Sequence, residues 1–334
     1  MHSLVALLVV VSVFAVSFGN LVAGEVQHLR VSSVAELMRT TETVSTISPE
    51  LMTVIHLDPE VYVLHDTYRI NRSNLQIIAS PGTKVILADH VNKPVVAIGS
   101  QEEVPSTTVE SITISGVEID GNKANQDFEL DVDLPWIRNN GIDIRAAHRV
   151  VLDNVVVHDA RSGGIVVSWG SSDIHVENSS FNDNFFDGVA YYDSERIYTT
   201  NTSMRNNQAA GISLDNDFRD SIFANCIVDG NGDVGIFMRF SQKIRFNGCA
   251  IQNSGSYAAF LSHDEGDNGV QDVVFSGCHF VNNNGGIKLA STDDNSKYNA
   301  VVSSVFRGNA QNGRLSIDDT EGAILHQSGN IVMP

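Results

Sequence analysis

The sequence predicts an all-β fold in which one chain winds into a solenoid of short parallel strands, three strands to each turn. The main observation is a repeat that begins with a glycine, once an alanine, followed by an apolar residue. The repeat occurs at Gly141-Ile142, Gly164-Ile165, Gly188-Val189, Gly211-Ile212, Gly235-Ile236, Ala259-Phe260 and Gly286-Ile287, with successive spacings of 23, 24, 23, 24, 24 and 27 residues. Each unit also holds three short runs of alternating apolar and polar residues, separated by clusters of Asn, Asp, Gly and Ser. Amphipathic helical stripes and a leucine lattice are absent from the sequence, which leaves a coil of strands.

Two further columns follow the same period. The first consists of asparagines that precede a strand, namely Asn154, Asn178, Asn201 and Asn225, at spacings of 24, 23 and 24 residues. Stacked Asn amides hydrogen-bond along the axis, so we expect this column to be buried and to satisfy turn amides. The residues that follow form a second, inward column, which includes Cys226, Cys249 and Cys278. Three cysteines without an interleaved histidine predict a ladder of reduced thiols rather than disulfides or a metal site.

The N-terminus predicts a leader peptide. Leu4 to Phe18 is an apolar run too short to span a membrane, and the small residues Val22-Ala23-Gly24 follow it. We therefore expect residues 1–24 to be a cleaved signal peptide and the mature protein to be secreted or periplasmic.

The remaining residues, 25–334, are expected to form a single domain, with regular coils over about 141–312. Ser33-Val34-Ala35-Glu36 is a capping box, which predicts a short helix to about Val44. Such a helix would seal the open N-terminal end of the coil. The sequence leaves the oligomeric state open.

The charge of the chain excludes several classes of partner. It has 40 acidic and 21 basic residues and a formal net charge of −19. Binding to nucleic acid or to an anionic membrane depends on clustered Lys and Arg, so we expect neither, and no later apolar run predicts membrane insertion.

One long interruption of the repeat, residues 122–140, is itself acidic. It contains Asp127, Glu129, Asp131 and Asp133. Ca²⁺ is the one candidate cofactor, with this loop as its site, although hard-cation sites need six or more converging oxygens. We expect a solvated loop, rather than a metal site, that overhangs the N-terminal end of the groove on the outward face of the coil.

The repeat resembles the right-handed parallel β-helix superfamily of pectate-lyase-like and mannuronan C5-epimerase-like proteins, over roughly Gln27 to the C-terminus. The turn length and the asparagine column carry this resemblance. It implies a right-handed, single-stranded parallel β-helix and a polysaccharide as the partner. Because the superfamily includes lyases, hydrolases, epimerases, tailspikes and adhesins, it does not imply one activity.

The catalytic motifs of these families are incomplete in this chain. The Asp-Pro-His-Glu/Asp motif of the epimerases is matched only by Asp143-Ile144-Arg145, which keeps the first Asp and has Arg in place of His. The Arg-x-Pro-x-x-Arg stretch of pectate lyases has no counterpart.

Outward-facing positions of the repeat predict where chemistry would occur. Counted from each glycine, positions two and four point inward, and positions three and five point outward on one face. Neighbouring turns lie about 4.8 Å apart, so residues at one position form a row. Position five reads Arg145, Ser168, Tyr192, Asp215, Arg239, His263 and Ala290, and position three reads Asp143, Val166, Ala190, Ser213, Phe237, Leu261 and Lys288.

The first chemistry that this row suggests is proton abstraction next to a uronate carboxylate, by a polysaccharide lyase or C5 epimerase. Arg239 or Arg145 would neutralise the carboxylate, and Asp215 would hold Arg239. His263 and Tyr192 would be the base and the acid, in either order. The expected substrate-binding residues are Asp143, Arg145, Trp169, Asp217, Phe237 and Glu265, with Phe237 and Leu261 as an apolar floor for a sugar ring.

Two other functions compete with it. An inverting glycoside hydrolase would use Asp215 and Asp217, whose Cα atoms would lie about 6.6 Å apart on one strand face, with Asp193 as a third carboxylate. A non-catalytic carbohydrate-binding or surface-interaction solenoid would explain why no family motif is complete.

Overall fold

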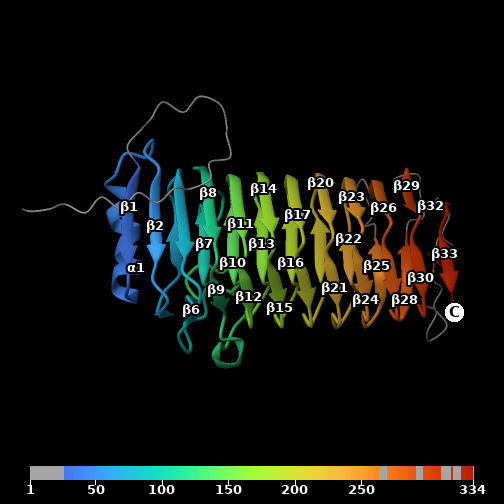
Figure 1. The fold of residues 1–334 in the computed structure, drawn as a ribbon, viewed down its shortest axis with the longest axis horizontal. Coiled ribbons are helices and arrows are strands. Elements are labelled where there is room, and N and C mark those ends of the chain that lie inside the picture. Colours follow the sequence, from blue (N-terminus) through green and yellow to red (C-terminus); the bar gives the residue numbers. More distant parts are fainter. Residues whose placement is uncertain (1–25, 263–268, 291–295, 310–316, 319–324, 334) are drawn as a thin grey trace, which may run out of the picture.

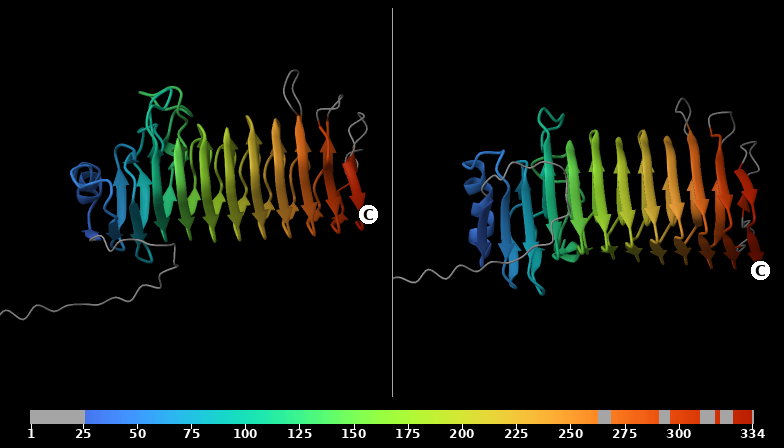
Figure 2. Two further views of the ribbon diagram at one scale, coloured as in Figure 1. Left: turned by 90° about the horizontal axis from the view of Figure 1, so that it is seen from above. Right: turned by 45° about the horizontal axis from the view of Figure 1, so that its top comes forward.

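The computed structural model describes residues 26–333 except 263–268, 291–295, 310–316 and 319–324. In these residues the chain coils into a long solenoid with three parallel sheets along its length (Figure 1). Figure 2 shows the same turns side by side from two other directions. The predicted all-β coil with three strands per turn is confirmed. Parallel pairing extends beyond the predicted range of 141–312, from Gln27 to Met333.

Each sheet is built from one strand per turn. The 12-stranded sheet contains β1 (Gln27–Val31), β2 (Thr53–Leu57), β5 (Leu75–Ala79), β8 (Val109–Ser115), β11 (Ala147–Asp153), β14 (Ser171–Glu177), β17 (Ser194–Thr200), β20 (Phe218–Ala224), β23 (Ser241–Asn247), β26 (Val270–Ser276), β29 (Asn299–Val302) and β32 (Leu325–Ser328). The 10-stranded sheet contains β4 (Tyr68–Ile70), β7 (Val96–Gly99), β10 (Ile142–Arg145), β13 (Ile165–Ser168), β16 (Val189–Tyr192), β19 (Ile212–Asp215), β22 (Ile236–Met238), β25 (Tyr257–Leu261), β28 (Gly285–Leu289) and β31 (Ile317–Asp318). The 11-stranded sheet contains β3 (Val61–Leu64), β6 (Lys84–Leu87), β9 (Glu118–Asp120), β12 (Val156–His158), β15 (Ser180–Asn182), β18 (Ser203–Arg205), β21 (Ile227–Asp229), β24 (Ala250–Gln252), β27 (His279–Val281), β30 (Val305–Arg307) and β33 (Ile331–Met333). Below, a rung means one turn of the coil, and within a sheet it means the single strand that this turn contributes.

The glycines of the repeat lie where successive turns pass closest to one another. A Cβ atom built on Gly164 would lie 2.6 Å from the carbonyl oxygen of Gly188, one turn further on. The same atom would lie 2.7 Å from Nδ2 of Asn184. Any side chain here would therefore separate the turns, which explains why the period is marked by glycine.

Two asparagine ladders run along the coil, and the predicted one is not the buried one. Asn154, Asn178, Asn201 and Asn225 are exposed, because they occupy turn positions with φ between 51° and 54°, a left-handed conformation that Asn tolerates well. Asn201 still donates to the Asn178 side chain at 3.3 Å. The prediction that this column is buried was wrong.

The buried ladder consists of other asparagines, among them Asn184, Asn207 and Asn231, which are 0–1% exposed. Oδ1 of Asn207 accepts hydrogen bonds from the backbone N–H and from the side-chain amide of Asn184, at 3.1 and 2.9 Å. Nδ2 of Asn207 donates to the Phe181 carbonyl at 3.1 Å and to Asn231 at 3.0 Å. These amides satisfy backbone groups that the turn would otherwise bury unpaired.

Inward-facing side chains fill the coil and stack from turn to turn. The rings of Phe223, Phe246 and Phe275 lie 4.8 and 4.7 Å apart in succession. The three cysteines are free and at most 2% exposed, as the inward column predicted. The core is therefore built by similar side chains that stack at the same position of successive turns.

The N-terminal end is covered by α1 (Val34–Ser45), as predicted. Oγ of Ser33 accepts from the backbone N–H of Glu36 at 3.3 Å, and the Glu36 carboxylate accepts from the N–H of Ser32 at 2.8 Å. Leu37 is only 1% exposed against the first turns. Among the described residues, no helix has the length and apolar character that crossing a membrane requires.

We expect Asn207→Ala to lower the free energy of unfolding by about 2–3 kcal/mol, because it leaves the buried Asn184 N–H and Phe181 carbonyl without these hydrogen bonds. The matched control is Asn201→Gly, which removes an exposed ladder amide but keeps the left-handed turn, and it should cost only a few tenths of a kcal/mol. Urea unfolding followed by circular dichroism measures both. Equal losses in the two variants would contradict the assignment of the buried ladder.

Candidate functional site

A pocket of about 390 Å³ lies between the long loop of residues 122–140 and the outer face of the 10-stranded sheet. Its lining residues are Trp136, Arg138 and Asn140 from the loop, Asp143 and Arg145 from β10, Val166 and Ser168 from β13, Trp169, Tyr192 from β16, Asp193 and Asn216. Both tryptophans of the chain line it. The pocket therefore joins one loop to several consecutive rungs.

The loop is held in place by its own polar residues. Oδ1 of Asp131, a residue that is 2% exposed, accepts from the backbone N–H groups of Asp133 and Leu134 at 2.8 and 3.1 Å. Lys93 forms an ion pair with Asp133 at 2.7 Å. The loop also contains a short 3-10 helix, η1 (Lys123–Asn125). It overhangs the outward row, as the sequence predicted, and buries the outward residues of β10.

Asp143 is the most deeply buried carboxyl group of the pocket. It is 3% exposed, and its Oδ2 accepts from Nδ2 of Asn140 at 2.9 Å. Its other oxygen, Oδ1, is buried and has no hydrogen-bond partner. Burial raises the pKa of Asp143 to about 6, and the nearby charge of Arg145 offsets only part of this effect.

Arg145 lies two residues further along β10 and is also 3% exposed. Its Nη2 donates to the Glu103 carbonyl at 3.0 Å, whereas Nε and Nη1 are buried without a partner. Its guanidinium carbon lies 5.5 Å from the ring centre of Trp169. Burial lowers the pKa of this guanidinium. Nε and Nη1 point to different edges of the guanidinium, so each is a charged donor for a separate acceptor oxygen.

Tyr192 forms the opposite side of the pocket and is linked to a second buried carboxyl group. Its hydroxyl lies 3.3 Å from Oγ of Ser213 and also hydrogen-bonds to Asp187. Burial, followed by the nearby Asp187 carboxyl, raises the pKa of Tyr192 well above its usual value. Asp187 is 8% exposed, its Oδ1 accepts from the N–H of Ala210 at 2.9 Å, and burial raises its pKa to about 6.

The structure does not bring Asp215 and Arg239 into this pocket. Nε of Arg239 donates to Oδ2 of Asp215 at 2.9 Å, and Asp215 is 6% exposed. Asp217 does not share a strand face with Asp215, because β19 ends at Asp215 and both Asn216 and Asp217 have positive φ, 54° and 64°. Asp217 is paired with Arg219 and accepts from Gln242. The predicted spacing of this carboxylate pair along one strand was wrong.

The register of the next rung also differs from the prediction. Phe237 pairs with Phe260 and Met238 with Leu261, so the repeat spacing here is one residue shorter than expected. Leu261 is fully buried instead of forming an apolar floor, and Phe260 takes its place beside Phe237. In this register Ser262 follows at position five, where the sequence predicted His263. His263 and Glu265 lie outside the described residues.

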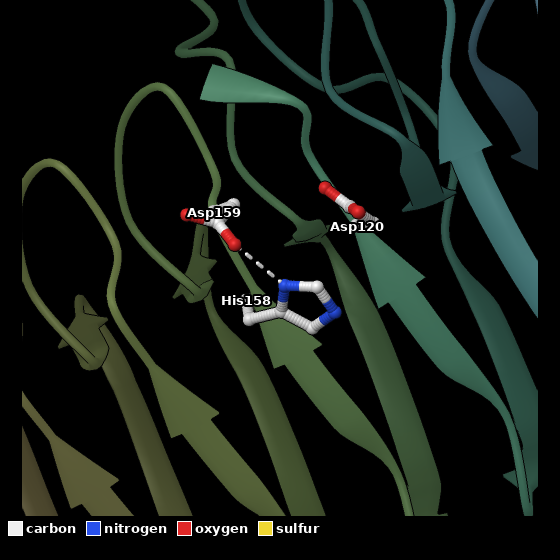
Figure 3. Close-up of side chains that lie close together, drawn as sticks. All are labelled: Asp120, His158 and Asp159. Carbon is white, nitrogen blue, oxygen red and sulfur yellow. Dashed lines mark hydrogen bonds and ion pairs between the residues drawn. The ribbon is translucent and has the colours of Figure 1, made fainter. Parts of the chain in front are cut away.

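A separate cluster of titratable groups lies at the C-terminal ends of the neighbouring strands β9 and β12 of the 11-stranded sheet. Figure 3 shows His158 directed toward Asp159, with Asp120 on the neighbouring rung. Their candidate ligand atoms lie within 4.8 Å of one another. Lys84 pairs with Asp120 at 2.8 Å and Lys123 with Asp159 at 3.1 Å, so the charge that a metal would use is already neutralised. The group fits an ion-pair network better than a metal centre.

The sequence analysis identified some of the pocket and missed the rest. It identified Asp143, Arg145, Trp169 and Tyr192, and it missed the lining residues Trp136, Arg138 and Asn140, which come from the loop. It also missed Asp187, which lies behind Tyr192 in a turn. Loop residues carry no periodic signal. The one usable signal was that both tryptophans flank the start of the regular repeat.

We expect Asp143→Asn to stabilise the protein at high pH. Because the folded-state pKa of about 6 exceeds the unfolded value, ionisation of Asp143 costs stability progressively as pH rises from about 4 to 6 and above. Asparagine still accepts from Asn140 and carries no charge, so the gain should approach about 3 kcal/mol at pH 8 and vanish near pH 4. Thermal unfolding at pH 4, 6 and 8 measures it, with exposed Asp233→Asn as the control. A pH-independent difference would contradict the assignment.

Comparison with known proteins agrees with this architecture. The family described as "right handed beta helix region" matches residues 95–270 and 166–330. No curated protein matches the chain in sequence.

Three solved structures are similar in fold. ORF18 of Geobacillus virus E2 is 13% identical with a TM-score of 0.70, and the match covers 91% of this chain and 61% of the viral protein. The A-module of mannuronan C-5 epimerase AlgE6 from Azotobacter vinelandii is 14% identical with a TM-score of 0.54, over 90% and 95% of the two chains. The endo-xylogalacturonan hydrolase of Aspergillus tubingensis is 14% identical with a TM-score of 0.63, over 93% of each chain. At these identities the likeness concerns the fold, and the family match together with the coil shows that the chain belongs to the right-handed β-helix family.

Proposed function

We propose that the chain is an exported enzyme that acts on a uronate-containing polysaccharide by proton abstraction, and that the pocket between the loop and β10 holds the reacting sugar. One observation carries the proposal. The pocket contains a buried guanidinium with two unsatisfied N–H groups, and beside it a buried carboxyl with one unsatisfied oxygen. Buried polar groups normally have partners, so a ligand that supplies them fits this site.

A uronate sugar supplies suitable partners. Its carboxylate would pair with the Arg145 guanidinium, which neutralises the charge and makes the adjacent C–H more acidic. The rings of Trp136 and Trp169, which are 41% and 42% exposed, offer apolar faces to the pyranose. The two similar structures named above as acting on mannuronan and on xylogalacturonan support this substrate class.

The acid and base follow from the two titratable groups that line the pocket. Asp143 takes the proton from C5, since a pKa of about 6 makes it a stronger base than an ordinary aspartate while it remains mostly ionised at neutral pH. Tyr192 keeps its proton because its pKa is raised, so it serves as the acid. Protonation of the leaving glycosidic oxygen completes β-elimination, and protonation of C5 from the other face completes epimerisation.

The glycoside-hydrolase alternative has less support. Its predicted carboxylates, Asp215 and Asp217, are each held by an arginine and do not face one another along a strand. The Asp215–Arg239 pair therefore serves mainly to tie two neighbouring rungs together.

The test is product formation by the mature protein on alginate, pectate, glycosaminoglycans and neutral glycans. Unsaturated, ultraviolet-absorbing ends indicate a lyase, and altered uronate ratios in proton NMR spectra indicate an epimerase. New reducing ends without unsaturation, or binding without products, would contradict the proposal in favour of a hydrolase or a binding solenoid.

We expect Asp143→Asn and Tyr192→Phe each to lower kcat by about 10²–10⁴-fold, because each removes a proton-transfer group. Arg145→Gln should raise KM as well as lower kcat, since it also removes the partner of the carboxylate. Asp215→Asn is the matched comparison from three rungs away, and it should retain activity. Activity lost in Asp215→Asn but kept in Asp143→Asn would move the site along the sheet to Asp215 and Arg239.

A further inference from the structure

A second group of aromatic and basic side chains lies on the outer face of the 10-stranded sheet, nearer the C-terminal end. It consists of Phe237 on β22, Tyr257 and Phe260 on β25, and Lys288 on β28, and we call it the distal cluster. The ring centres of Phe237 and Phe260 lie 6.1 Å apart, and those of Tyr257 and Phe260 6.0 Å apart. Nζ of Lys288 lies 5.8 Å from the Tyr257 ring centre and 5.9 Å from that of Phe260. All four side chains are partly exposed.

Strand register places three members of the distal cluster, Phe237, Phe260 and Lys288, on the same row as Asp143. Parallel strand pairing connects, in turn and with one residue per rung, Asp143, Val166, Ala190, Ser213, Phe237, Phe260 and Lys288. Six rung spacings separate Asp143 from Lys288, a length of about 29 Å.

The residues between the two ends of this row are small. Val166, Ala190 and Ser213 occupy three consecutive rungs between Asp143 and Phe237. Ala190 and Ser213 are only 2% and 7% exposed, and the Tyr192 hydroxyl lies 3.3 Å from Oγ of Ser213, so Tyr192 forms part of the surface over these rungs. We call the outer surface over these rungs the track. Aromatic and basic side chains lie at one end of it in the pocket and at the other end in the distal cluster.

We infer that the distal cluster is a second sugar subsite, which binds the far part of an acidic polysaccharide while another residue of the same chain occupies the pocket. This inference rests on the proposed function. Lys288 provides a positive charge for a uronate carboxylate, and the rings of Phe237 and Phe260 provide an apolar surface for a pyranose. The protein has a net charge of −19, so a basic group beside aromatic rings on this track is a local exception that favours an anion.

The length of the row sets the length of polysaccharide that the two sites would bind together. An extended polysaccharide advances per sugar by roughly one rung spacing, so the two sites together would span about seven sugars, one at each end and five between them.

The inference is tested by the dependence of affinity on oligosaccharide length. Protein carrying Asp143→Asn, to suppress turnover, is titrated by calorimetry with oligogalacturonates and oligomannuronates, each as a dimer, a tetramer and an octamer. We expect the octamer to bind more tightly than the dimer. Adding Lys288→Gln or Phe260→Ala should weaken the octamer about fivefold and leave the dimer unchanged.

The matched control is Lys297→Gln. Nζ of Lys297 lies 5.8 Å from the ring centre of Tyr298, which precedes β29 in the 12-stranded sheet. Lys297→Gln therefore also removes a lysine beside an aromatic ring, but one away from the 10-stranded sheet, and the affinity for the octamer should not change. If Lys288→Gln and Lys297→Gln bind the octamer equally well, the distal cluster is not a subsite, and the proposed function stands. If no oligouronate of any length binds before Lys288 is changed, it is the proposed function that fails.

Discussion

Successive turns of this protein are in direct backbone contact along the line of the repeat glycines. At Gly164 a side chain would collide both with the carbonyl of the next turn and with the buried amide of Asn184. The asparagine amides fill the space that the glycines leave and satisfy the backbone groups of the turn. Because both features recur with one period, each turn lies directly over its neighbour, and outward side chains form straight rows. The pocket and the distal cluster both depend on this registration.

The coil itself was predictable because its main constraint is local and repeated. A glycine is needed wherever the turns touch, and this requirement appears in the sequence as a period. The assignment of the asparagines failed because two columns share both residue type and period. At Asn178 the residue type is favoured by a left-handed turn, whereas at Asn184 it is favoured by buried hydrogen bonds. Sequence spacing alone does not separate these two causes.

The candidate site was predictable where it lies on strands and unpredictable where it lies on a loop. Alternation correctly assigned Asp143, Arg145 and Tyr192 to one outer face. It did not reveal that residues 122–140 fold over β10, and this cover turns an exposed row into a pocket with raised pKa values. At β25 the spacing shortened by one residue, and a slip of one residue exchanges the inward and outward faces, as Leu261 and Phe260 show.

The in-register stacking of the 10-stranded sheet has a consequence for how such a molecule changes in length. Since each turn contacts only its two neighbours, removing or duplicating one whole turn between β19 and β28 would move the two ends of the track by about 4.8 Å without turning any side chain to the other face. The distance between the two ends of the track can therefore change only in steps of one turn. Evolution by repeat gain or loss would alter the size of ligand it spans in discrete steps, while the chemistry at β10 stays untouched.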